Sequence, residues 1–377
     1  MIGPFEFATA NRIIFGDGTF SRLVEIAGAI GQRPLVVTGQ RGVESPGLHG
    51  PRFAVPHEPT IELIRDGSNA FRQGGCDCVI GIGGGSVIDA GKAIAAAAAN
   101  PGHLLDYLEV IGKGQPLQKP PYPFIAVPTT AGTGSEVTRN AVLASPEHRV
   151  KVSLRSLLML PRVALIDPLL TLDLPPALTA STGMDAVTQL IEPYVCLRAN
   201  SFVDNLCLDG LRHAAGSLRR AYRDGHDKKA RAGMSYASLL GGLALANAGL
   251  GVVHGFAAPI GGMFDAPHGA VCAALLPAGI EANLRALRER DPQGASLRRY
   301  RAIANVVIAS EDAIPEDLAG WVRVIQKDLA IPPLSAYGIC GSDVPQLVEK
   351  AARASSMQAN PIALTPAELT SVIENSL

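Results

Sequence analysis

Two histidines, a carboxylate and a side-chain amide have the residue types and spacing of a metal site. His254 and His268 lie in VVHGFAAPIGGMFDAPHG, and each is followed by a glycine. The prolines and the glycine pair between them disfavour one uninterrupted helix, so we expect the second histidine to fold back towards the first. Asp185 and Gln189 are four residues apart and share one face of a predicted helix. The four side chains form a candidate site for a divalent ion.

Gln189 is the weakest member of this set. Its neutral amide oxygen is a poorer donor to Fe²⁺ or Zn²⁺ than an imidazole nitrogen. With glutamine at position 189, metal binding is weakened, limited to three protein ligands, or lost. The sequence does not distinguish these three outcomes. Pro193 follows four residues later and would remove the helical hydrogen bond to the Gln189 carbonyl. We therefore expect the helix to bend or end at Pro193.

A glycine-rich segment, GIGGGSVIDAGKA, is suited to binding phosphate. Its glycines stand between a predicted strand and the start of a helix. Glycines let the backbone approach a ligand, and the first N–H groups of a helix can donate to a pyrophosphate. The spacing is not GxGxxG, and a turn of this kind can also be purely structural. The residues predicted to bind the cofactor here are Gly83, Gly84, Gly85 and Ser86.

A hydroxyl-rich loop, PTTAGTGSEVT, follows another predicted strand. Its side chains could donate to phosphate or sugar, and its two glycines allow close approach. The alternative is a capping turn that merely starts a helix at Ser135. Two such loops after two strands of one sheet favour a shared dinucleotide more than either loop does alone. The residues predicted to contact it are Thr129, Thr130, Thr133 and Ser135.

The elements that must position these residues change in type near residue 175. Before it, RIIFG, PLVVTG, FAVP, CDCVIGIG, PYPFIAVP and PRVALIDP are predicted strands that alternate with helical patterns. This alternation favours a mostly parallel α/β sheet covered on both faces. Beyond it, apolar residues recur at helical spacing. We predict a nucleotide-binding α/β domain over residues 1–175 and an all-α metal and substrate domain over residues 176–377.

The composition and charge of the chain indicate which kind of partner it binds and in which compartment it is found. The 377 residues carry a net charge of −1, so neither nucleic acid nor an anionic membrane is expected, and the partner is a small molecule. The start lacks the pattern of a signal peptide, and no apolar run reaches the roughly 20 residues of a membrane span. The six cysteines form no CxxC pair and hence no zinc ribbon. We expect a reduced, cytoplasmic protein.

Six motifs together resemble a known family. GGGSVIDAGKA, PTTAGTGSEVT, the DP and LP of ALIDPLLTLDLP, TGMDA, NAGLGVVHG and PHG occur in the order found in iron-dependent (group III) alcohol dehydrogenases. The resemblance covers roughly residues 10–285. It implies a dehydroquinate synthase-like fold, with an α/β nucleotide-binding domain, a helical domain, and cofactor and metal in the cleft between. It also implies a homodimer or a higher homo-oligomer.

The resemblance assigns the metal ligands and the reaction. By position the ligands are Asp185, Gln189, His254 and His268, and Gln189 stands where the family usually has histidine. The implied reaction is hydride transfer between NAD(P)(H) and a small alcohol, aldehyde or ketone whose oxygen Fe²⁺ or Zn²⁺ polarises. A second cleft histidine of many members is replaced by Ala258. Proton relay then needs water, a cofactor hydroxyl or another side chain, and no general base is assigned.

Cofactor preference is also indicated by position. NAD-preferring members carry an acidic residue just after the first strand, where this chain has Gly39 followed by Gln40 and Arg41. Without that carboxylate a 2′-phosphate is not repelled, and Arg41 could pair with one, which favours NADP(H) over NAD(H). The resemblance also places Asp89 and Lys151 at the cofactor cleft, Lys151 as a ribose or phosphate contact.

Two alternatives stand beside this dehydrogenase. A metal-independent reductase of the same fold, similar to maleylacetate reductase, is favoured by Gln189, whereas Asp185 and the histidine pair favour a metal-assisted enzyme. A catalytically silent nucleotide-binding protein would bind the cofactor without turning over any alcohol or aldehyde.

Overall fold

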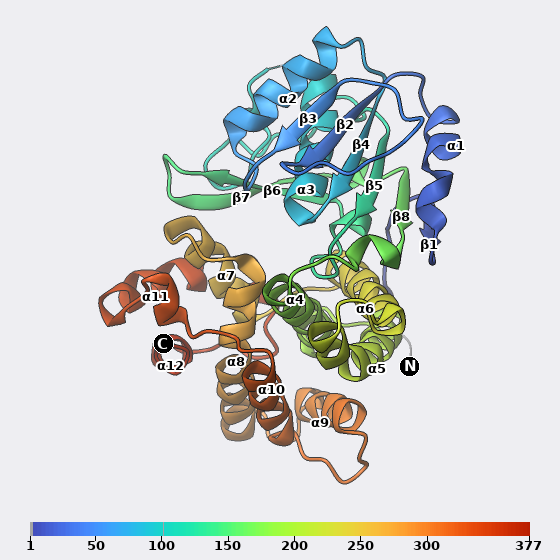
Figure 1. Cartoon of the computed structure of the whole chain (residues 1–377). Helices are drawn as coiled ribbons and strands as arrows, with labels where there is room; N and C mark the ends of the chain where they lie inside the picture. The colour runs from blue at the N-terminus through green and yellow to red at the C-terminus, as the bar shows by residue number, and fades with distance from the viewer. Residues whose placement is uncertain (1–2, 101) are drawn as a thin grey trace. The chain divides into compact units, whose positions relative to one another are not determined.

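The computed structural model describes residues 3–100 and 102–377 and divides into two compact units (Figure 1). The α/β unit comprises Ala8–Thr130 and Gly134–Leu172. The helical unit comprises Asp173–Leu377, the short segment Ala131–Thr133, and the N-terminal residues as far as Phe7. The predicted fold class, a parallel α/β sheet followed by an all-helical part, is confirmed.

A six-stranded parallel sheet forms the centre of the α/β unit. The strand order is β1-β8-β5-β4-β2-β3. Five strands fall within segments predicted to be strands, and β3 begins one residue before the predicted FAVP. Because all six run parallel, their carboxyl ends lie along one edge of the sheet. The strands are β1 (Ile13–Phe15), β2 (Pro34–Gly39), β3 (Arg52–Val55), β4 (Cys78–Gly83), β5 (Phe124–Pro128) and β8 (Val163–Ile166).

Alternate strand residues build an apolar core on each face of this sheet. Leu35 and Val37 of β2 belong to the core that includes residues of helices α2 and α3. Val36, between them, belongs to the core on the other face, with residues of α1. Successive side chains of a strand point to opposite faces, so both faces are buried, as is usual for a parallel sheet. The helices are α1 (Leu23–Gly28), α2 (Ile61–Gln73) and α3 (Gly85–Ala99).

An antiparallel hairpin in the α/β unit was not predicted. It consists of β6 (Asn140–Ser145) and β7 (Val150–Arg155), joined by a four-residue turn. Its signal was present in the sequence of β7, VKVSLR, where apolar and polar residues alternate with the period of a strand. The buried side chains, which include Leu143 and Val152, extend the core that contains α2 and α3.

Helices make up the helical unit, and no strand follows β8 in the part of the chain that the structure describes. Helix α4 packs against α5, α6 and α8, and α7 packs against α8. Helix α8 is long and apolar enough to cross a membrane, but 89% of its most apolar window is buried inside the protein. The helices are α4 (Pro176–Val195), α5 (Ser201–Arg223), α6 (Lys228–Asn247), α7 (Val252–Met263), α8 (His268–Arg290), α9 (Ala295–Ile308), α10 (Asp317–Asp328), α11 (Val344–Ala352) and α12 (Pro366–Glu374).

The structure tests two expectations about helix ends. The break between the two histidines is confirmed, because α7 ends at Met263 and α8 begins at His268. Of the two outcomes expected at Pro193, a bend or an end, the helix end is not observed, because α4 continues through this proline to Val195. Only two helical residues follow Pro193, and all of α4 from Gly183 onward is buried, so packing holds the last turn although one hydrogen bond is missing.

Candidate functional site

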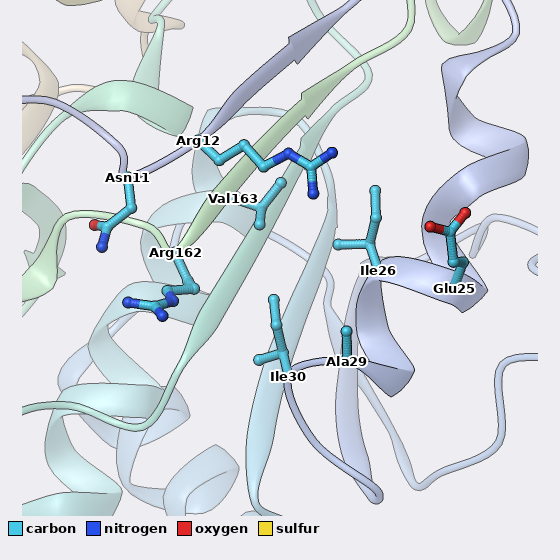
Figure 2. A pocket seen from close by; sticks show the side chains of 8 residues that line it. All are labelled: Asn11, Arg12, Glu25, Ile26, Ala29, Ile30, Arg162 and Val163. Atoms are coloured by element: carbon cyan, nitrogen blue, oxygen red, sulfur yellow. The ribbon is translucent and has the colours of Figure 1, made fainter.

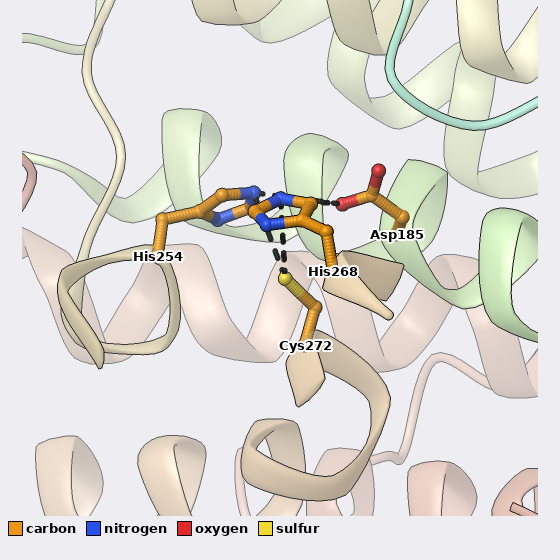
Figure 3. A group of neighbouring side chains, drawn as sticks. All are labelled: Asp185, His254, His268 and Cys272. Carbon is orange, nitrogen blue, oxygen red and sulfur yellow. Dashed lines mark hydrogen bonds and ion pairs between the residues drawn. The ribbon is translucent and has the colours of Figure 1, made fainter. Parts of the chain in front are cut away.

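Three helices of the helical unit bring four potential metal ligands together (Figure 3). Asp185 comes from α4, His254 from α7, and His268 and Cys272 from the first turns of α8. One ligand atom from each residue lies within 4.8 Å of the others. Three of the four were candidate ligands from the sequence, whereas Cys272 was counted there only among scattered cysteines. Its signal was the four-residue spacing from His268, which puts both on one helix face.

The spacing of these atoms suits ligands around an ion better than hydrogen-bonded partners. Asp185 Oδ1 lies 3.6 Å from Nε2 of His254 and 3.6 Å from Nε2 of His268. Nitrogen and oxygen ligands about 2.1 Å from a tetrahedral Zn²⁺ are about 3.4 Å apart, whereas a hydrogen bond is shorter, about 2.9 Å. Asp185 Oδ1 is buried and has no hydrogen-bond partner among the described residues. A cation held between these atoms would pair the buried carboxylate.

The four side chains differ in exposure. Asp185, His254 and Cys272 are buried, whereas the side chain of His268 is 36% exposed. Solvent therefore reaches the group at the His268 imidazole. Ala258, at the position of the missing relay histidine, is exposed one helical turn after His254 on α7.

Glu192 orients the His254 imidazole. Its Oε2 lies 2.6 Å from His254 Nδ1, and its Oε1 accepts a hydrogen bond of 2.7 Å from the Val253 backbone N–H. A carboxylate at Nδ1 favours the tautomer protonated there, which leaves the Nε2 lone pair facing Asp185 and Cys272. The sequence analysis missed Glu192, although it lies seven residues after Asp185 and so on the same face of α4.

The electrostatics of the group favour positive charge at its centre. Burial opposes ionisation of Asp185, but His268 and His254 hold the pKa of its carboxyl below its ordinary value. Burial also opposes ionisation of Cys272, yet the same two imidazoles hold the pKa of its thiol below its ordinary value. Burial disfavours a charged His254, but Cys272 and Glu192 raise its pKa well above the usual range.

Gln189 lies one turn after Asp185 and binds a backbone carbonyl. Its Nε2 donates a 3.3 Å hydrogen bond to Gly132 O, and its Oε1 is buried without a hydrogen-bond partner among the described residues. Gly132 is grouped with the helical unit and lies so close to Thr182 that an added Cβ would be 2.7 Å from the Thr182 Cβ. Gln189 therefore helps to hold the segment Ala131–Thr133 against α4.

The two predicted phosphate loops lie side by side in the α/β unit. They follow β4 and β5, which are neighbours in the sheet. The Thr129 N–H donates to Gly83 O at 2.9 Å, and a Cβ on Gly84 would lie 3.2 Å from Thr130 Cγ2. Gly84 therefore also meets a packing requirement, because a side chain there would crowd the neighbouring loop.

The predicted cofactor residues of β2 and α3 lie at the carboxyl edge of the sheet. Gly39 ends β2, Gly84 caps α3, and Gly85 and Ser86 form the first helical turn. Gln40 and Arg41 follow β2 and are exposed. The strands β2 and β4 are neighbours in the sheet. The chain leaves β2 towards β3 at one end of the sheet and leaves β4 towards β5 in the opposite direction, so the strand order reverses between β2 and β4. Open α/β sheets bind ligands at such a switch point.

The remaining predicted cofactor residues take part in internal contacts. Asp89 Oδ2 accepts a 2.9 Å hydrogen bond from the Val142 N–H, and Lys151 Nζ forms a 2.5 Å ion pair with Glu58. Ser135 is buried and starts a single 3-10 turn, Ser135–Val137. The cap of that turn is Gly134, with φ at 59°, and not Ser135. Thr133 is grouped with the helical unit.

A separate pocket of about 370 Å³ lies at the amino-terminal ends of β1 and β8 (Figure 2). Arg12 and Arg162 line it together with Glu25 and with apolar residues of α1 such as Ile26. It includes none of the residues predicted to bind cofactor or metal. Nucleotides bind open α/β sheets at the opposite, carboxyl edge, so this pocket does not suit the dinucleotide.

Similarity to known proteins extends over nearly the whole chain. The family profile described as "Iron-containing alcohol dehydrogenase" matches residues 10–168. The profile described as "Fe-containing alcohol dehydrogenase family, C-terminal" matches residues 179–377. The two matches together contain both phosphate loops and the four clustered side chains.

Individual relatives agree with this assignment. The 1,3-propanediol dehydrogenase of Klebsiella pneumoniae is 36% identical over 374 residues, 95% of each chain. Alcohol dehydrogenase 4 of Saccharomyces cerevisiae is 36% identical over 319 residues, 84% of this chain and 80% of the yeast protein. The solved structure of an alcohol dehydrogenase from Oenococcus oeni superposes with a TM-score of 0.91 at 31% identity, covering 99% of this chain and all of the other. The resemblance drawn from the six motifs is thus confirmed, and the chain belongs to the iron-containing alcohol dehydrogenase family, whose members are oxidoreductases.

Proposed function

We propose that this enzyme transfers a hydride between NADP(H) or NAD(H) and a small alcohol or aldehyde, at a divalent-ion site that includes Asp185, His254 and His268. The observation that carries the proposal is the buried Asp185 Oδ1, which lacks a hydrogen-bond partner and lies 3.6 Å from Nε2 of each histidine. The names of the relatives, a propanediol dehydrogenase and an alcohol dehydrogenase, support small alcohols as the substrate class.

The residues of this chain would have distinct roles at the site. When bound, the ion supplies Lewis acidity towards the substrate oxygen, and the nicotinamide supplies or takes the hydride. In the neutral His254 ring, Glu192 would accept the hydrogen of Nδ1, so that Nε2 is the nitrogen that would hold the ion. Asp185 and His254 are buried, so water is excluded from their side of the site. Substrate approaches beside His268, the exposed member of the group.

The cofactor part of the proposal rests on the carboxyl edge of the sheet. Backbone N–H groups of Gly85 and Ser86, at the start of α3, are placed to donate to a pyrophosphate. Gly39 offers no carboxylate to repel a 2′-phosphate, and the exposed Arg41 offers a guanidinium to pair with it. We therefore favour NADP(H) over NAD(H).

Location and assembly belong to the same proposal. All six cysteines are unpaired in the structure, which supports a reducing compartment and hence the cytoplasm. A homodimer or higher homo-oligomer is supported by the family resemblance alone.

A metal-removal experiment tests the function. The purified protein is stripped with a chelator, reloaded with Zn²⁺ or with Fe²⁺ under anaerobic conditions, and assayed with short-chain aldehydes using NADPH and NADH in parallel. We expect about one ion per chain after reloading, loss of turnover on stripping, and a higher kcat/KM with NADPH.

Two outcomes would contradict the proposal and support a different function. Undiminished turnover in chelator would support a metal-independent reductase of the same fold. Cofactor binding without turnover on any alcohol or aldehyde, with or without metal, would support a silent nucleotide-binding protein.

A further inference from the structure

We propose that Cys272 supplies a thiolate as the fourth protein ligand of the ion site, in the role that Gln189 was expected to play, and that the site therefore selects Zn²⁺ over Fe²⁺. This inference rests on the proposed metal-assisted function and assigns the ligand set and ion class of that same site.

The position of the sulfur carries the assignment. Cys272 Sγ lies 3.7 Å from His268 Nε2 and 3.9 Å from His254 Nε2. A sulfur about 2.3 Å and a nitrogen about 2.1 Å from a tetrahedral Zn²⁺ are separated by about 3.6 Å. Figure 3 shows the Cys272 thiol below the two imidazoles and the Asp185 carboxylate to their right. The distances from the sulfur and from the Asp185 oxygen to the two imidazole nitrogens, 3.6–3.9 Å, are thus close to those expected around one tetrahedral ion.

Helix α8 holds the thiol rigidly in this place. Cys272 is one turn after His268 and fully buried. Its neighbours Val271 and Ala273 are also fully buried, so packing on both sides prevents the helix from turning the thiol away. Ligands on packed helices keep their geometry better than ligands on loops. The thiol is thus already placed at the site before an ion binds.

Gln189 is less suited to the same role. Its Nε2 is used by Gly132 O, and only the neutral Oε1 could act as a ligand. That oxygen is buried without a hydrogen-bond partner among the described residues, so it is the competing candidate that the experiment must separate from Cys272. A thiolate binds borderline ions far better than an amide oxygen does.

The ligand set determines which ion is favoured. Two imidazoles, one carboxylate and one thiolate at tetrahedral spacing are typical of Zn²⁺. Soft thiolate ligands also shift selectivity towards Zn²⁺ over the harder Fe²⁺. Replacing the thiol should therefore weaken Zn²⁺ binding more than Fe²⁺ binding.

Cobalt(II) substitution tests the assignment without relying on activity. The ion-free, full-length protein is titrated with Co²⁺, whose visible d–d bands report binding and whose near-ultraviolet thiolate-to-Co²⁺ charge-transfer band reports a sulfur ligand. We expect both signals in the wild type. In Cys272→Ser and Cys272→Ala we expect no charge-transfer band and at least a tenfold loss of affinity, roughly the lower bound for removing even an outer-shell partner. The ratio of Zn²⁺ to Fe²⁺ affinity should also fall in both variants.

Two matched variants serve as controls. Cys207→Ser removes another fully buried cysteine, on α5 and outside the clustered group, and should leave both signals unchanged. Gln189→Ala should retain the charge-transfer band and bind Co²⁺ within about threefold of the wild type, because an amide oxygen contributes little to a borderline ion.

The possible failures are distinguishable. Visible bands without a charge-transfer band in the wild type would overturn the Cys272 assignment and leave the metal-assisted function standing, and this result needs no variant. Loss of the ion in Gln189→Ala but not in the Cys272 variants would overturn it as well. If the wild type binds no Co²⁺, Zn²⁺ or Fe²⁺, the metal-assisted function itself fails, and the ligand assignment fails with it.

Discussion

Two buried polar clusters, one in each unit, differ in how their charged groups are paired. In the α/β unit, Lys92 is completely buried, and its Nζ lies 3.1 Å from Asp89 Oδ1. The same ammonium donates to Ser135 O and Thr138 Oγ1 at 3.0 Å and to the carbonyl of Asn140. Asp89 Oδ1 has no hydrogen-bond partner among the described residues, but the buried ammonium of Lys92 pairs its charge inside the protein.

In the helical unit, the cluster around Asp185 pairs its charges differently. Its N···O distances of 3.6 Å are too long for hydrogen bonds, and Asp185 Oδ1 has no such partner among the described residues. A buried charge is costly unless it is paired. The difference is that the buried Asp89 carboxylate is paired with an ammonium, whereas Asp185 Oδ1 has only the two imidazoles near it, which supports the proposed ion site.

Asp185→Asn should give the largest effect, because it keeps the shape of the side chain and removes its charge. A catalytic metal contributes several kcal/mol, so kcat/KM for aldehyde reduction should fall by about 10³-fold or more, together with the bound ion. Elemental analysis and steady-state kinetics measure this, with the exposed Asp209→Asn on α5 as the control. A variant that kept both ion and rate would show that the cluster around Asp185 is not the active site.

Lys92→Met should destabilise the fold instead. It leaves Asp89 buried without its cation and removes the donor to the nearby carbonyl groups, so the free energy of unfolding should fall by about 3–5 kcal/mol. Chemical denaturation measures the change. Lys113→Met removes a cation from an exposed pair with Asp106 and should leave the denaturation midpoint unchanged. An equally small effect at Lys92 would mean that its cluster is not structural.

Glu136 makes the stability of the Lys92 region depend on pH. Burial raises the pKa of its carboxyl to about 7, although Lys92 acts in the opposite direction. The folded state therefore holds a proton that the unfolded state has lost, and the free energy of unfolding falls as pH rises from about 4.5 to about 7. Glu136→Gln lacks this titration, so its stability relative to the wild type should rise by about 3 kcal/mol across that window. Denaturation at a series of pH values measures it, and parallel curves would contradict the raised pKa.

Glu192→Gln should have the smallest effect of the four. The amide oxygen can still accept from the Val253 N–H, but the amide no longer favours the His254 tautomer protonated at Nδ1. Ion affinity should fall by about 10–100-fold, the usual range for such partners of a ligand, with little change in the denaturation midpoint of the ion-free protein. Competition with a chelating dye measures the affinity. A loss of stability without a loss of affinity would mean that Glu192 serves only to hold α7.

Much of the fold could be predicted because its signals are local. The six sheet strands are short β-branched runs, and the break between His254 and His268 follows from the prolines and glycines around FDAP. Strand β7 of the hairpin has an equally local alternating pattern, but the hairpin interrupts the expected order of strand and helix and was missed. At Pro193 the local signal predicted a bend or an end of the helix. The helix does not end there, because the burial of α4 outweighs one missing hydrogen bond.

The family, the parallel sheet with its glycine-rich turns, and three of the four clustered side chains could be predicted from the sequence, since motifs, turns and helix faces depend on residues close along the chain. Tertiary packing brings Cys272 to Asp185, Glu192 to His254, and the Gln189 amide to Gly132. These contacts link α4, α7, α8 and a loop that are distant along the chain. Which side chains meet there depends on how the elements pack, and helical spacing alone does not contain that information.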